Sequence, residues 1–532
     1  MAYYSLHAYD ADVWLTDFRG VNQAGAEIGS DIRYAVEAEN VETPKGVLQP
    51  HAGTSLMKGG FEKKIETLMM FHRRWYDGPG SKDWLVAAVD GKLYYRQLDS
   101  ASGNWIEIDM PSGITAFESS VWSFVTYETS QQGVDHPIDV LLISNAVDGM
   151  YMVLPPDRPN VFEDIEDTTF DELKETTFLT IMATADWTIN AVDTQDYKFG
   201  VIERNAERVW GSAIADLPDK LVYSRPYDPT DWTGPTSDEQ PEDAAGDIDQ
   251  PTWDGDRFTA LKTFGNQLIA FKHHHVWRVM GISPGEYTFT EQYGGGTVYP
   301  NTIAVDVDRI YMAGDDGMLL YDGASVRNFI RDEIHEIWKR ANRAAMDQMC
   351  AVLHRDRYYL AFPIDGSATN NALLVYNKNE GTVLFYTDLN IEAFLSWEGV
   401  LYATSSTEPG KVHILHYDAW EQESSTGSAT RWVSPWIDFG RKSVQKGGYE
   451  LYFTPEVKGA PMTFTFSIQT EKKVKSKTVT VQTTTFKAKQ KRIRFGGAGR
   501  RFRLIIETAS APTETVWRLI GGIHMVVETD PD

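Results

Sequence analysis

The sequence FGNQLIAFKHHHVWRVMG, residues 264–281, contains the pattern that decides the predicted fold. Gly265 and Asn266 are typical turn residues, and the apolar run 268–271 after them has the length of a buried strand. The polar residues 272–275 reverse the chain, and residues 276–279 form the return strand. The stretch therefore predicts a β-hairpin with an apolar spine.

Similar hairpins recur along most of the chain. Residues 84–89 are followed by Asp90-Gly91 and a second strand, and residues 140–145 are followed by Asp148-Gly149 and another. We place repeating units at 65–108, 120–153, 198–232, 258–289, 303–330, 349–386 and 394–417. The later units begin about 40–50 residues apart, which is typical of propeller blades. The sequence therefore predicts an all-β protein in which residues 61–428 form a β-propeller of six to eight blades, with seven favoured.

Two insertions interrupt the repeat. Residues 228–256 are rich in Pro, Asp, Glu and Gly and predict a long exposed acidic loop. Residues 332–349 predict a helix, because acidic residues come first, basic residues come later, and apolar residues recur at helical spacing. Its apolar stripe consists of Ile334, Ile337, Trp338, Ala341, Ala345 and Met349. We expect this stripe to pack on the flank of the propeller, with a second subunit as the alternative.

The two ends of the chain differ from the repeats. Residues 1–60 lack a strong period and predict an irregular arm with one or two short strands, either loosely packed or docked on a neighbouring subunit. After a polar linker at 421–428, clean alternation in stretches such as TFTFSI, residues 463–468, predicts an antiparallel β-sandwich over 429–532. Residues 492–495 and 501–506 are expected to form a hairpin around Gly496–Gly499.

Composition and charge exclude several classes of protein. The single cysteine, Cys350, permits neither an intramolecular disulfide framework nor a cysteine-built zinc site. No secretory signal or membrane span is recognisable, so we expect a soluble protein that folds in the cytosol. The net charge of −26 argues against nonspecific binding of nucleic acid. Residues 431–510 differ, because their 17 Lys or Arg and 5 Asp or Glu give about +12, against about −38 elsewhere.

The run His273–His275 is the most conspicuous candidate metal site. Neighbouring residues point in different directions, so at most His273 and His275 could converge, and no acidic or cysteine partner is spaced nearby. A solvated hairpin turn explains the run better than a metal does.

Carboxylates suggest two further sites, each with a simpler explanation. The stretch Asp247, Asp249, Asp254 and Asp256 could hold calcium, but it lacks the pattern of an EF-hand and also fits an acidic loop. The pair Asp315-Asp316 could serve glycoside hydrolysis, but a tight turn favours Asp for backbone reasons alone. We therefore assign no catalytic, metal-binding or cofactor-binding residue, predict no cofactor, and do not expect an enzyme.

The basic C-terminal region supplies the candidate interface. Alternation places Arg492, Arg494, Arg501 and Arg503 on one face, opposite Ile493, Phe495, Phe502 and Leu504. That face is either simply solvated or docks on an acidic partner, and the rest of this chain is acidic. The glycines at 496–499, beside Arg500 and Arg501, could alternatively cradle a phosphate.

Several stretches resemble tail proteins of tailed bacteriophages that are built on propellers. They are VEAENV at 36–41, KLVYS at 220–224, YDPTDW at 227–232, NQLIAF at 266–271, RFRL at 501–504 and WRLIGGI at 517–523. The resemblance lies in the general pattern of these strand and turn stretches over most of the chain and not in one motif. It implies no catalytic residues.

The resemblance implies a virion structural protein of the tail nozzle or hub type. Such a protein would form a homo-oligomeric ring, for example a hexamer, contact adjacent tail or connector proteins, and let genomic DNA pass without sequence-specific binding. It would be made in the host cytoplasm, become part of the virion tail, and not insert into a membrane. Two alternatives remain at this point: a propeller adsorption protein that binds a glycan or receptor, for which the 16 tryptophans offer sugar platforms, and a polysaccharide-cleaving enzyme.

Overall fold

The computed structural model describes residues 10–24, 31–74, 81–98, 103–129, 138–154, 187–235, 243–439, 445–484 and 488–529. Strands dominate these residues, and every pairing between named strands is antiparallel. The all-β prediction is therefore confirmed, and the strands form many small sheets.

The hairpin that opened the sequence analysis lies where it was predicted. Strand β18 (Phe258–Phe264) turns through Gly265 into β19 (Gln267–Lys272), which pairs with β20 (Val276–Met280). The run from Leu268 to Phe271 is completely buried. Burial of a large apolar side chain contributes about 1.5–3 kcal/mol, so this run is a substantial part of the local core.

Within the described chain, seven four-stranded sheets contain the seven hairpin units expected from the sequence. The first three are built from β6 (Thr67–Arg74), β7 (Ser81–Val89), β8 (Lys92–Gln97) and β9 (Ile106–Glu107); β10 (Ser123–Thr129), β11 (Ile138–Asn145), β12 (Gly149–Leu154) and β13 (Thr188–Ala191); and β14 (Val201–Asn205), β15 (Arg208–Ser212), β16 (Lys220–Tyr223) and β17 (Gly246–Asp249). The next three are built from β18 to β20 with β21 (Thr288–Glu291); β22 (Ala304–Val305), β23 (Ile310–Gly314), β24 (Gly317–Tyr321) and β25 (Val326–Ile330); and β26 (Cys350–His354), β27 (Arg357–Phe362), β28 (Ala372–Asn377) and β29 (Thr382–Tyr386).

The seventh sheet combines strands from two distant parts of the chain. Strands β30 (Ile391–Trp397), β31 (Val400–Ser405) and β32 (Val412–Leu415) are completed by β5 (Thr54–Leu56), which pairs with β32. Ser55 lies opposite Ile414 in this pairing. The N-terminal segment therefore supplies the outer strand of the last sheet.

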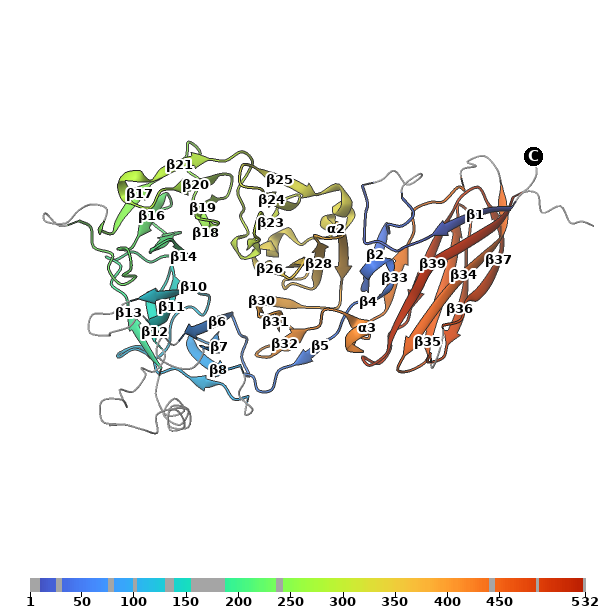
Figure 1. Ribbon diagram of the computed structural model, residues 1–532, viewed down its shortest axis with the longest axis horizontal. Helices are drawn as coiled ribbons and strands as arrows, with labels where there is room; N and C mark the ends of the chain where they lie inside the picture. Colours follow the sequence, from blue (N-terminus) through green and yellow to red (C-terminus); the bar gives the residue numbers. More distant parts are fainter. Residues whose placement is uncertain are drawn as a thin grey trace, which may run out of the picture.

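Successive sheets contact one another through their first strands. These contacts join β6 to β10, β14, β18, β22, β26 and β30 in turn, and β30 contacts β6 again. Apolar clusters fill the spaces between neighbouring sheets; for example, Ile269 and Phe271 pack with Ile310 and Met312. Figure 1 shows these sheets side by side in the left two-thirds of the molecule.

The C-terminal region contributes two sheets, one of four strands and one of five, that face each other. One has the order β1-β39-β34-β37 and the other has the order β2-β33-β38-β35-β36. Their strands are β1 (Asp10–Leu15), β2 (Glu37–Glu39), β33 (Thr430–Val433), β34 (Lys446–Lys458), β35 (Met462–Thr470), β36 (Val474–Val481), β37 (Lys491–Gly499), β38 (Phe502–Thr508) and β39 (Val516–Thr529). Phe453 and Phe466 meet across the two sheets with ring centres 4.3 Å apart.

The predicted hairpin around Gly496–Gly499 is wrong. These glycines are the last residues of β37, which pairs with β34, whereas β38 pairs with β33 and β35 in the opposite sheet. The chain crosses between the sheets at Arg500 and Arg501 instead of folding back on itself. The alternation of apolar and polar residues shows that each strand has one buried face, but it does not show which strand lies next to it. The pattern therefore fits a hairpin and a crossover between sheets equally well.

The N-terminal segment is more ordered than the one or two strands predicted for it. Its described part contains five strands, among them the short pair β3 (Val41–Glu42) and β4 (Gln49–Pro50). Strands β1 and β2 add to the edges of the two C-terminal sheets by pairing with β39 and β33. The segment thus docks within its own chain, and residues 1–9 lie outside the described part.

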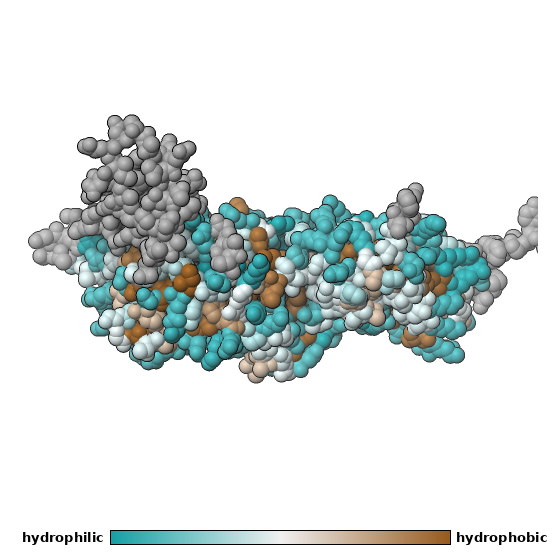
Figure 2. All heavy atoms as spheres, turned by 90° about the horizontal axis from the view of Figure 1, so that it is seen from below, coloured by the Kyte–Doolittle hydropathy of each residue, from teal (hydrophilic) through white to brown (hydrophobic). Residues whose placement is uncertain are grey.

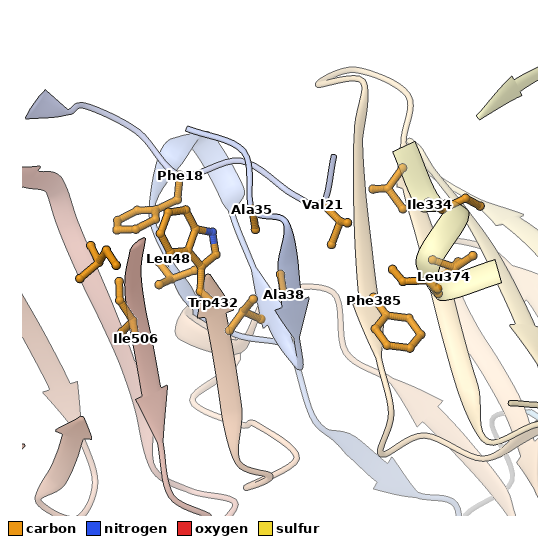
Figure 3. Packing of buried hydrophobic residues seen from close by; sticks show 14 of the residues in the cluster. Phe18, Val21, Ala35, Ala38, Leu48, Ile334, Leu374, Phe385, Trp432 and Ile506 are labelled. Carbon is orange, nitrogen blue, oxygen red and sulfur yellow. The ribbon is translucent and has the colours of Figure 1, made fainter. Parts of the chain in front are cut away.

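A continuous apolar core joins the seven sheets to the C-terminal pair. In Figure 3, side chains of the N-terminal segment lie between residues of β33 and β38 on one side and residues of β28, β29 and the helical segment on the other. The labelled residues of this cluster are Phe18, Val21, Ala35, Ala38, Leu48, Ile334, Leu374, Phe385, Trp432 and Ile506. Phe18 meets Trp432 edge to face at 5.2 Å. The two parts of the molecule therefore share one core.

A buried ion pair crosses the same junction. Arg357 on β27 donates to the Glu42 carboxylate on β3 at 3.0 Å, and the two side chains are 6% and 3% exposed. Tyr386 donates to the same carboxylate oxygen at 3.1 Å. Desolvation opposes the charge on Arg357, but the nearby Glu42 raises the pKa of its guanidinium overall. The pair fixes β3 against the sixth sheet.

The helix predicted at 332–349 is broken into three short pieces. They are η5 (Asp332–Ile334), α2 (His335–Lys339) and η6 (Arg343–Gln348). The break falls at Asn342, whose amide donates to the Pro363 carbonyl and whose side chain accepts from Ala344. A capping side chain competes with helix continuation in this way. The predicted apolar stripe is nevertheless buried, and it packs within this chain.

The predicted acidic loop at 228–256 also contains regular structure. Residues 246–249 form β17, which pairs with β16. Residues 236–242 of the insertion lie outside the described part. Among the residues that the structure describes, the remaining helical pieces are η1 (Pro44–Gly46), η3 (Pro284–Glu286), η4 (Pro300–Thr302) and α3 (Ala419–Gln422).

The surface seen from below is mostly hydrophilic. Figure 2 shows an elongated molecule on which hydrophobic residues form scattered small groups, and hydrophilic residues cover much of the end formed by the C-terminal sheets. Charged and polar groups therefore dominate what this face offers to a partner.

Replacing Arg357 with methionine is expected to lower the free energy of unfolding by about 3–5 kcal/mol, because it leaves the Glu42 carboxylate buried without its counter-ion. Urea denaturation followed by tryptophan fluorescence measures the change. The control Arg355→Met, at an exposed residue two positions away, should change stability by less than about 0.5 kcal/mol. Equal effects of the two substitutions would contradict the assigned role of the pair.

Candidate functional site

The four arginines predicted to share one face lie on two different sheets. Arg492 and Arg494 belong to β37, whereas Arg503 belongs to β38 and Arg501 immediately precedes it. Since β37 and β38 pair with different neighbours, the single basic face expected from alternation does not form.

Arg492 and Arg494 are engaged by a carboxylate of the same sheet. Both donate to Glu450 on β34, with Arg492 Nε at 2.9 Å from Glu450 Oε2. The hydrogen bond from Arg492 is the main reason that the pKa of Glu450 falls to about 2. These two arginines therefore already have a partner within the protein.

Arg501 and Arg503 share an aromatic partner. Their guanidinium carbons lie 5.7 and 4.7 Å from the centre of the Trp436 ring. Arg501 also lies 3.4 Å from Glu471. This pair is therefore also engaged by groups of its own chain.

A groove opens at the end of the C-terminal sheets beside these arginines. It consists of two adjoining pockets of about 570 and 250 Å³ that share Gln445, Lys472 and Ala498. The glycines at 496, 497 and 499 lie in its wall, so backbone replaces side chains there. Its charged lining residues are Asp438, Glu471, Lys472, Lys473, Lys475, Arg500 and Arg501. We call this feature the basic groove.

The lysines of the basic groove, unlike the arginines, form no ion pairs with carboxylates of the described residues. Lys472, Lys473 and Lys475 are exposed and ion-pair with no carboxylate of the described chain. They sit at the turn from β35 to β36 and on β36, an edge strand of its sheet. Lysines on an exposed edge oppose strand addition, and they also present positive charge to an acidic partner. The alternation pattern did not indicate this site, because Lys472 and Lys473 occupy a turn and only Lys475 lies on a strand.

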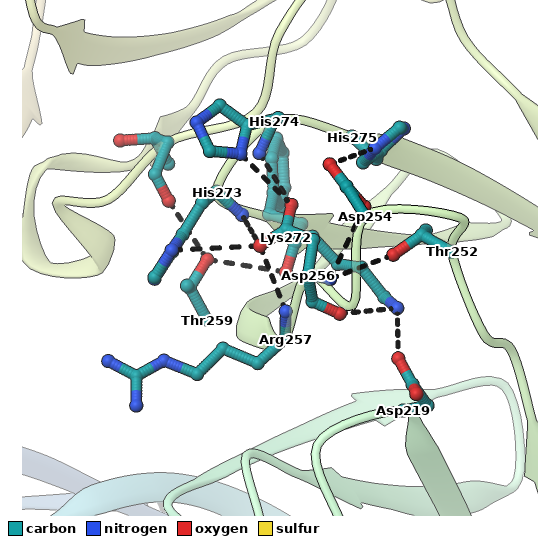
Figure 4. A network of polar contacts seen from close by, with 12 residues as sticks. Asp219, Thr252, Asp254, Asp256, Arg257, Thr259, Lys272, His273, His274 and His275 are labelled. Carbon is teal, nitrogen blue, oxygen red and sulfur yellow. Dashed lines mark hydrogen bonds and ion pairs between the residues drawn. The ribbon is translucent and has the colours of Figure 1, made fainter.

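The histidine run lies in a hairpin turn, as predicted, but acidic residues do reach it. Figure 4 shows the connector before β18 lying against the turn between β19 and β20. Asp256 faces His273 and His274, and His275 binds Asp254 at 3.1 Å. The expectation that no acidic partner is nearby is therefore wrong. Sequence spacing missed these contacts because the carboxylates come from a preceding connector and not from the turn itself.

The four aspartates considered for calcium do not converge. Asp247 and Asp249 on β17 both pair with Lys220, whereas Asp254 and Asp256 belong to the histidine cluster. The pair Asp315-Asp316 lies in the exposed β23–β24 turn. Asp315 accepts a hydrogen bond from Tyr299, and Asp316 faces Arg331 at 3.7 Å. Each pair therefore has a structural explanation.

A buried His–Asp–Thr cluster was not predicted. His51 Nε2 donates to Asp388 at 2.8 Å, its Nδ1 lies 2.9 Å from the Ala52 carbonyl, and Thr426 also donates to Asp388. A nucleophilic triad needs the acid and the hydroxyl on opposite ring nitrogens, whereas here both lie at Nε2. The cluster therefore fixes the junction and is not arranged for catalysis. Its members are too far apart in sequence for any spacing pattern to reveal them.

The pKa values in this cluster move in opposite directions. Burial lowers the pKa of His51, but the charge and hydrogen bond of Asp388 outweigh it, so the pKa of His51 is raised above 6.5. Burial raises the pKa of Asp388, but His51 and Thr426 bring it down to about 2. The pair is therefore charged at mildly acidic pH.

Other conspicuous side chains have ordinary environments. Trp84 and Trp210 are buried, as expected for core residues, whereas Trp253 is 91% exposed. Burial raises the pKa of the Cys350 thiol far above its usual range. In the residues that the structure describes, no helix has the length and hydrophobicity needed to cross a membrane.

Comparisons with known proteins add little to this picture. No protein-family model and no curated protein matches the chain. A solved structure titled "AfRom2 CNH domain" matches at a TM-score of 0.36 and 10% sequence identity, over 69% of this chain and 99% of that chain. A similarity of this size assigns neither a family nor a function.

The His51–Asp388 pair predicts a specific pH dependence of stability. Its contribution is complete below the ordinary histidine pKa of 6.5 and is lost as pH rises through the raised folded-state value. The Asp388 contribution is complete above its ordinary 3.8 and is lost as pH falls towards about 2. From about pH 6 to about pH 8.5, urea denaturation should show a larger loss of stability in the wild type than in His51→Gln. Parallel curves would contradict this role.

Proposed function

We propose that this chain is a structural subunit of a tailed-bacteriophage virion that forms a homo-oligomeric ring around the DNA channel of the tail. In this proposal the seven four-stranded sheets are the blades of a closed β-propeller, and the two C-terminal sheets form a β-sandwich. The contacts that lead from β6 through each sheet and back from β30 support the propeller assignment.

The separation of charge within one molecule carries the proposal. The stretch 431–510 has a charge of about +12, and the remaining chain has about −38. A shared core and the N-terminal strands hold the two parts together. Each copy therefore presents an acidic surface and a basic surface in a fixed relative orientation.

Fixed complementary surfaces favour head-to-tail association. When a basic patch on one copy meets an acidic patch on the next, the contact is heterologous, and repeated rotation closes it into a ring. The basic groove is the best candidate for the basic patch in this contact, because its lysines ion-pair with no carboxylate of the described residues. The arginines first considered for this role are already engaged by Glu450 and Trp436.

The acidic remainder suits a channel wall. Phosphate contacts dominate the affinity of proteins for DNA, so a wall of negative charge lets DNA pass without adhering. The ring contacts adjacent tail or connector proteins at its ends in this proposal, and no chemical step is required of it.

Mass photometry at micromolar concentration tests the ring. We expect a discrete oligomer that dissociates as salt rises, since the screening length falls from about 10 Å at 0.1 M to about 3 Å at 1 M. Reversing the charges of Lys472, Lys473 and Lys475 to glutamate should abolish it.

The matched control reverses Lys45, Lys58 and Lys198, three exposed lysines elsewhere that ion-pair with no carboxylate of the described residues and give the same change in net charge. The control should retain the oligomer. A monomeric wild type, or equal loss of the oligomer in both variants, would overturn the proposal.

Glycan recognition is a second candidate, because two exposed aromatic residues flank the histidine cluster. Trp253 and Tyr293 are 91% and 86% exposed. Trp253 precedes Asp254, and Tyr293 follows Glu291 by two residues, and both carboxylates contact His275. Exposed aromatic faces are suited to stacking on sugar rings.

A glycan array distinguishes this second candidate from the first. Under glycan recognition, the wild type binds a defined set of glycans and Trp253→Ala loses the signal, whereas Tyr227→Ala, at another exposed aromatic residue, keeps it. An empty array combined with a salt-sensitive oligomer excludes glycan recognition and supports the ring.

A further inference from the structure

The connector between β17 and β18 brings two carboxylates to the histidine turn of the next hairpin. Asp254, Asp256 and His274 each offer one potential ligand atom, and these three atoms lie within 4.8 Å of one another. Figure 4 shows Asp254 and His274 on either side of the Asp256 carboxylate. The three residues come from two segments that the fold holds against each other.

Asp256 is held rigidly in this arrangement. Its side chain is 3% exposed, its Oδ2 accepts the His274 amide at 2.6 Å, and its Oδ1 accepts the Arg257 amide at 2.9 Å and the His273 amide at 3.2 Å. These bonds fix the orientation of the carboxylate. A carboxylate has about four acceptor sites, so lone-pair capacity remains for another donor or an ion.

The distances between ring nitrogens and carboxylate oxygens fit a shared ion better than direct hydrogen bonds. His274 Nδ1 lies 3.7 Å from Asp256 Oδ2, and His273 Nδ1 lies 3.6 Å from Asp256 Oδ1. Both distances exceed those of a hydrogen bond. Two ligands of a tetrahedral zinc ion, each about 2.0–2.1 Å from the metal, lie about 3.4 Å apart.

Neighbouring groups orient the second carboxylate. His275 donates to Asp254 Oδ2 at 3.1 Å, its other ring nitrogen faces Glu291, and the Asp256 amide donates to Asp254 Oδ1 at 3.3 Å. Outer hydrogen bonds of this kind fix the direction of a ligand at metal sites. Lys272 also holds the connector in place, because its Nζ donates to the Asp256 carbonyl at 2.9 Å and to the Asp219 carboxylate at 2.6 Å.

We propose that Asp254, Asp256 and His274 bind one divalent transition-metal ion, with Zn²⁺ as the expected ion. An imidazole nitrogen with two carboxylates suits Zn²⁺ or Co²⁺, whereas Ca²⁺ takes six to eight oxygen ligands. The bound ion joins the connector to the β19–β20 turn and so stabilises the contact between the third and fourth sheets. This site is independent of ring formation.

The test uses full-length protein without a polyhistidine tag, because such a tag binds the same ions. Isothermal titration with Zn²⁺ should give one site per chain, and Co²⁺ should give the visible absorption of a tetrahedral or five-coordinate ion. His274→Ala and Asp254→Asn should each weaken binding at least about tenfold. The melting temperature of the wild type should rise with Zn²⁺, and that of His274→Ala should not.

Two comparisons make the result decisive. His335→Ala removes another exposed histidine and should leave Zn²⁺ binding unchanged. Titration with Ca²⁺ should show much weaker binding. The proposal is overturned if no stoichiometric Zn²⁺ site is found, if His274→Ala and Asp254→Asn bind as tightly as the wild type, or if Ca²⁺ binds equally well without His274.

Discussion

The passage of the N-terminal segment between the two parts of the molecule is the constraint on which the rest of the structure depends. Residues near the start of the chain supply edge strands to both C-terminal sheets and the outer strand to the seventh sheet. Ala11 pairs with Val527, so the two ends of the chain meet in one sheet. Neither part can complete its sheets without this segment. Contacts of such long sequence separation are slow to form, and folding is complete only after the C-terminal strands have been synthesised.

The polar groups at this junction fix orientation more than they add stability. The desolvation cost of a buried ion pair such as Glu42–Arg357 offsets much of its attraction, so a well-packed apolar pair could be as stable. An apolar pair would, however, permit sliding, whereas the ion pair and the His51–Asp388 bond each accept one geometry. The acidic and basic surfaces are therefore held at a fixed angle. A head-to-tail ring requires this property, because a variable angle would give open chains.

Local patterns predicted the hairpins well, and contacts between distant segments account for the errors. The run from Leu268 to Phe271 and the glycine turn before it specify a hairpin without help from the rest of the chain. Strand β5 has only three residues and becomes a strand through pairing with β32, so no period could reveal it. Alternation in β37 and β38 correctly marked the buried faces but could not show that the two strands belong to different sheets. The helix predicted at 332–349 is interrupted at Asn342, because its side chain caps the next turn and its backbone amide donates to Pro363, despite the helical spacing of the apolar residues. The approach of Asp254 and Asp256 to the histidine turn depends on how a connector crosses between sheets, which sequence spacing does not encode.

In the C-terminal sheets, arginines and lysines have different roles. The arginines contact groups of the same chain, whereas the lysines of the basic groove are free to meet a partner. The planar guanidinium of arginine binds carboxylates through two parallel hydrogen bonds and stacks on aromatic rings. Arg492 uses the first mode with Glu450, and Arg503 uses the second with Trp436, so both side chains are held by groups of the same chain. Lysine is a compact, hydrated charge on a flexible stem, and it loses much conformational entropy when it is fixed by a single carboxylate. Lysines at an exposed turn or on an edge strand therefore stay available, as those of the basic groove do. It follows that the lysines at 472, 473 and 475, and not the more regularly spaced arginines, are the groups through which this region can attract an acidic partner.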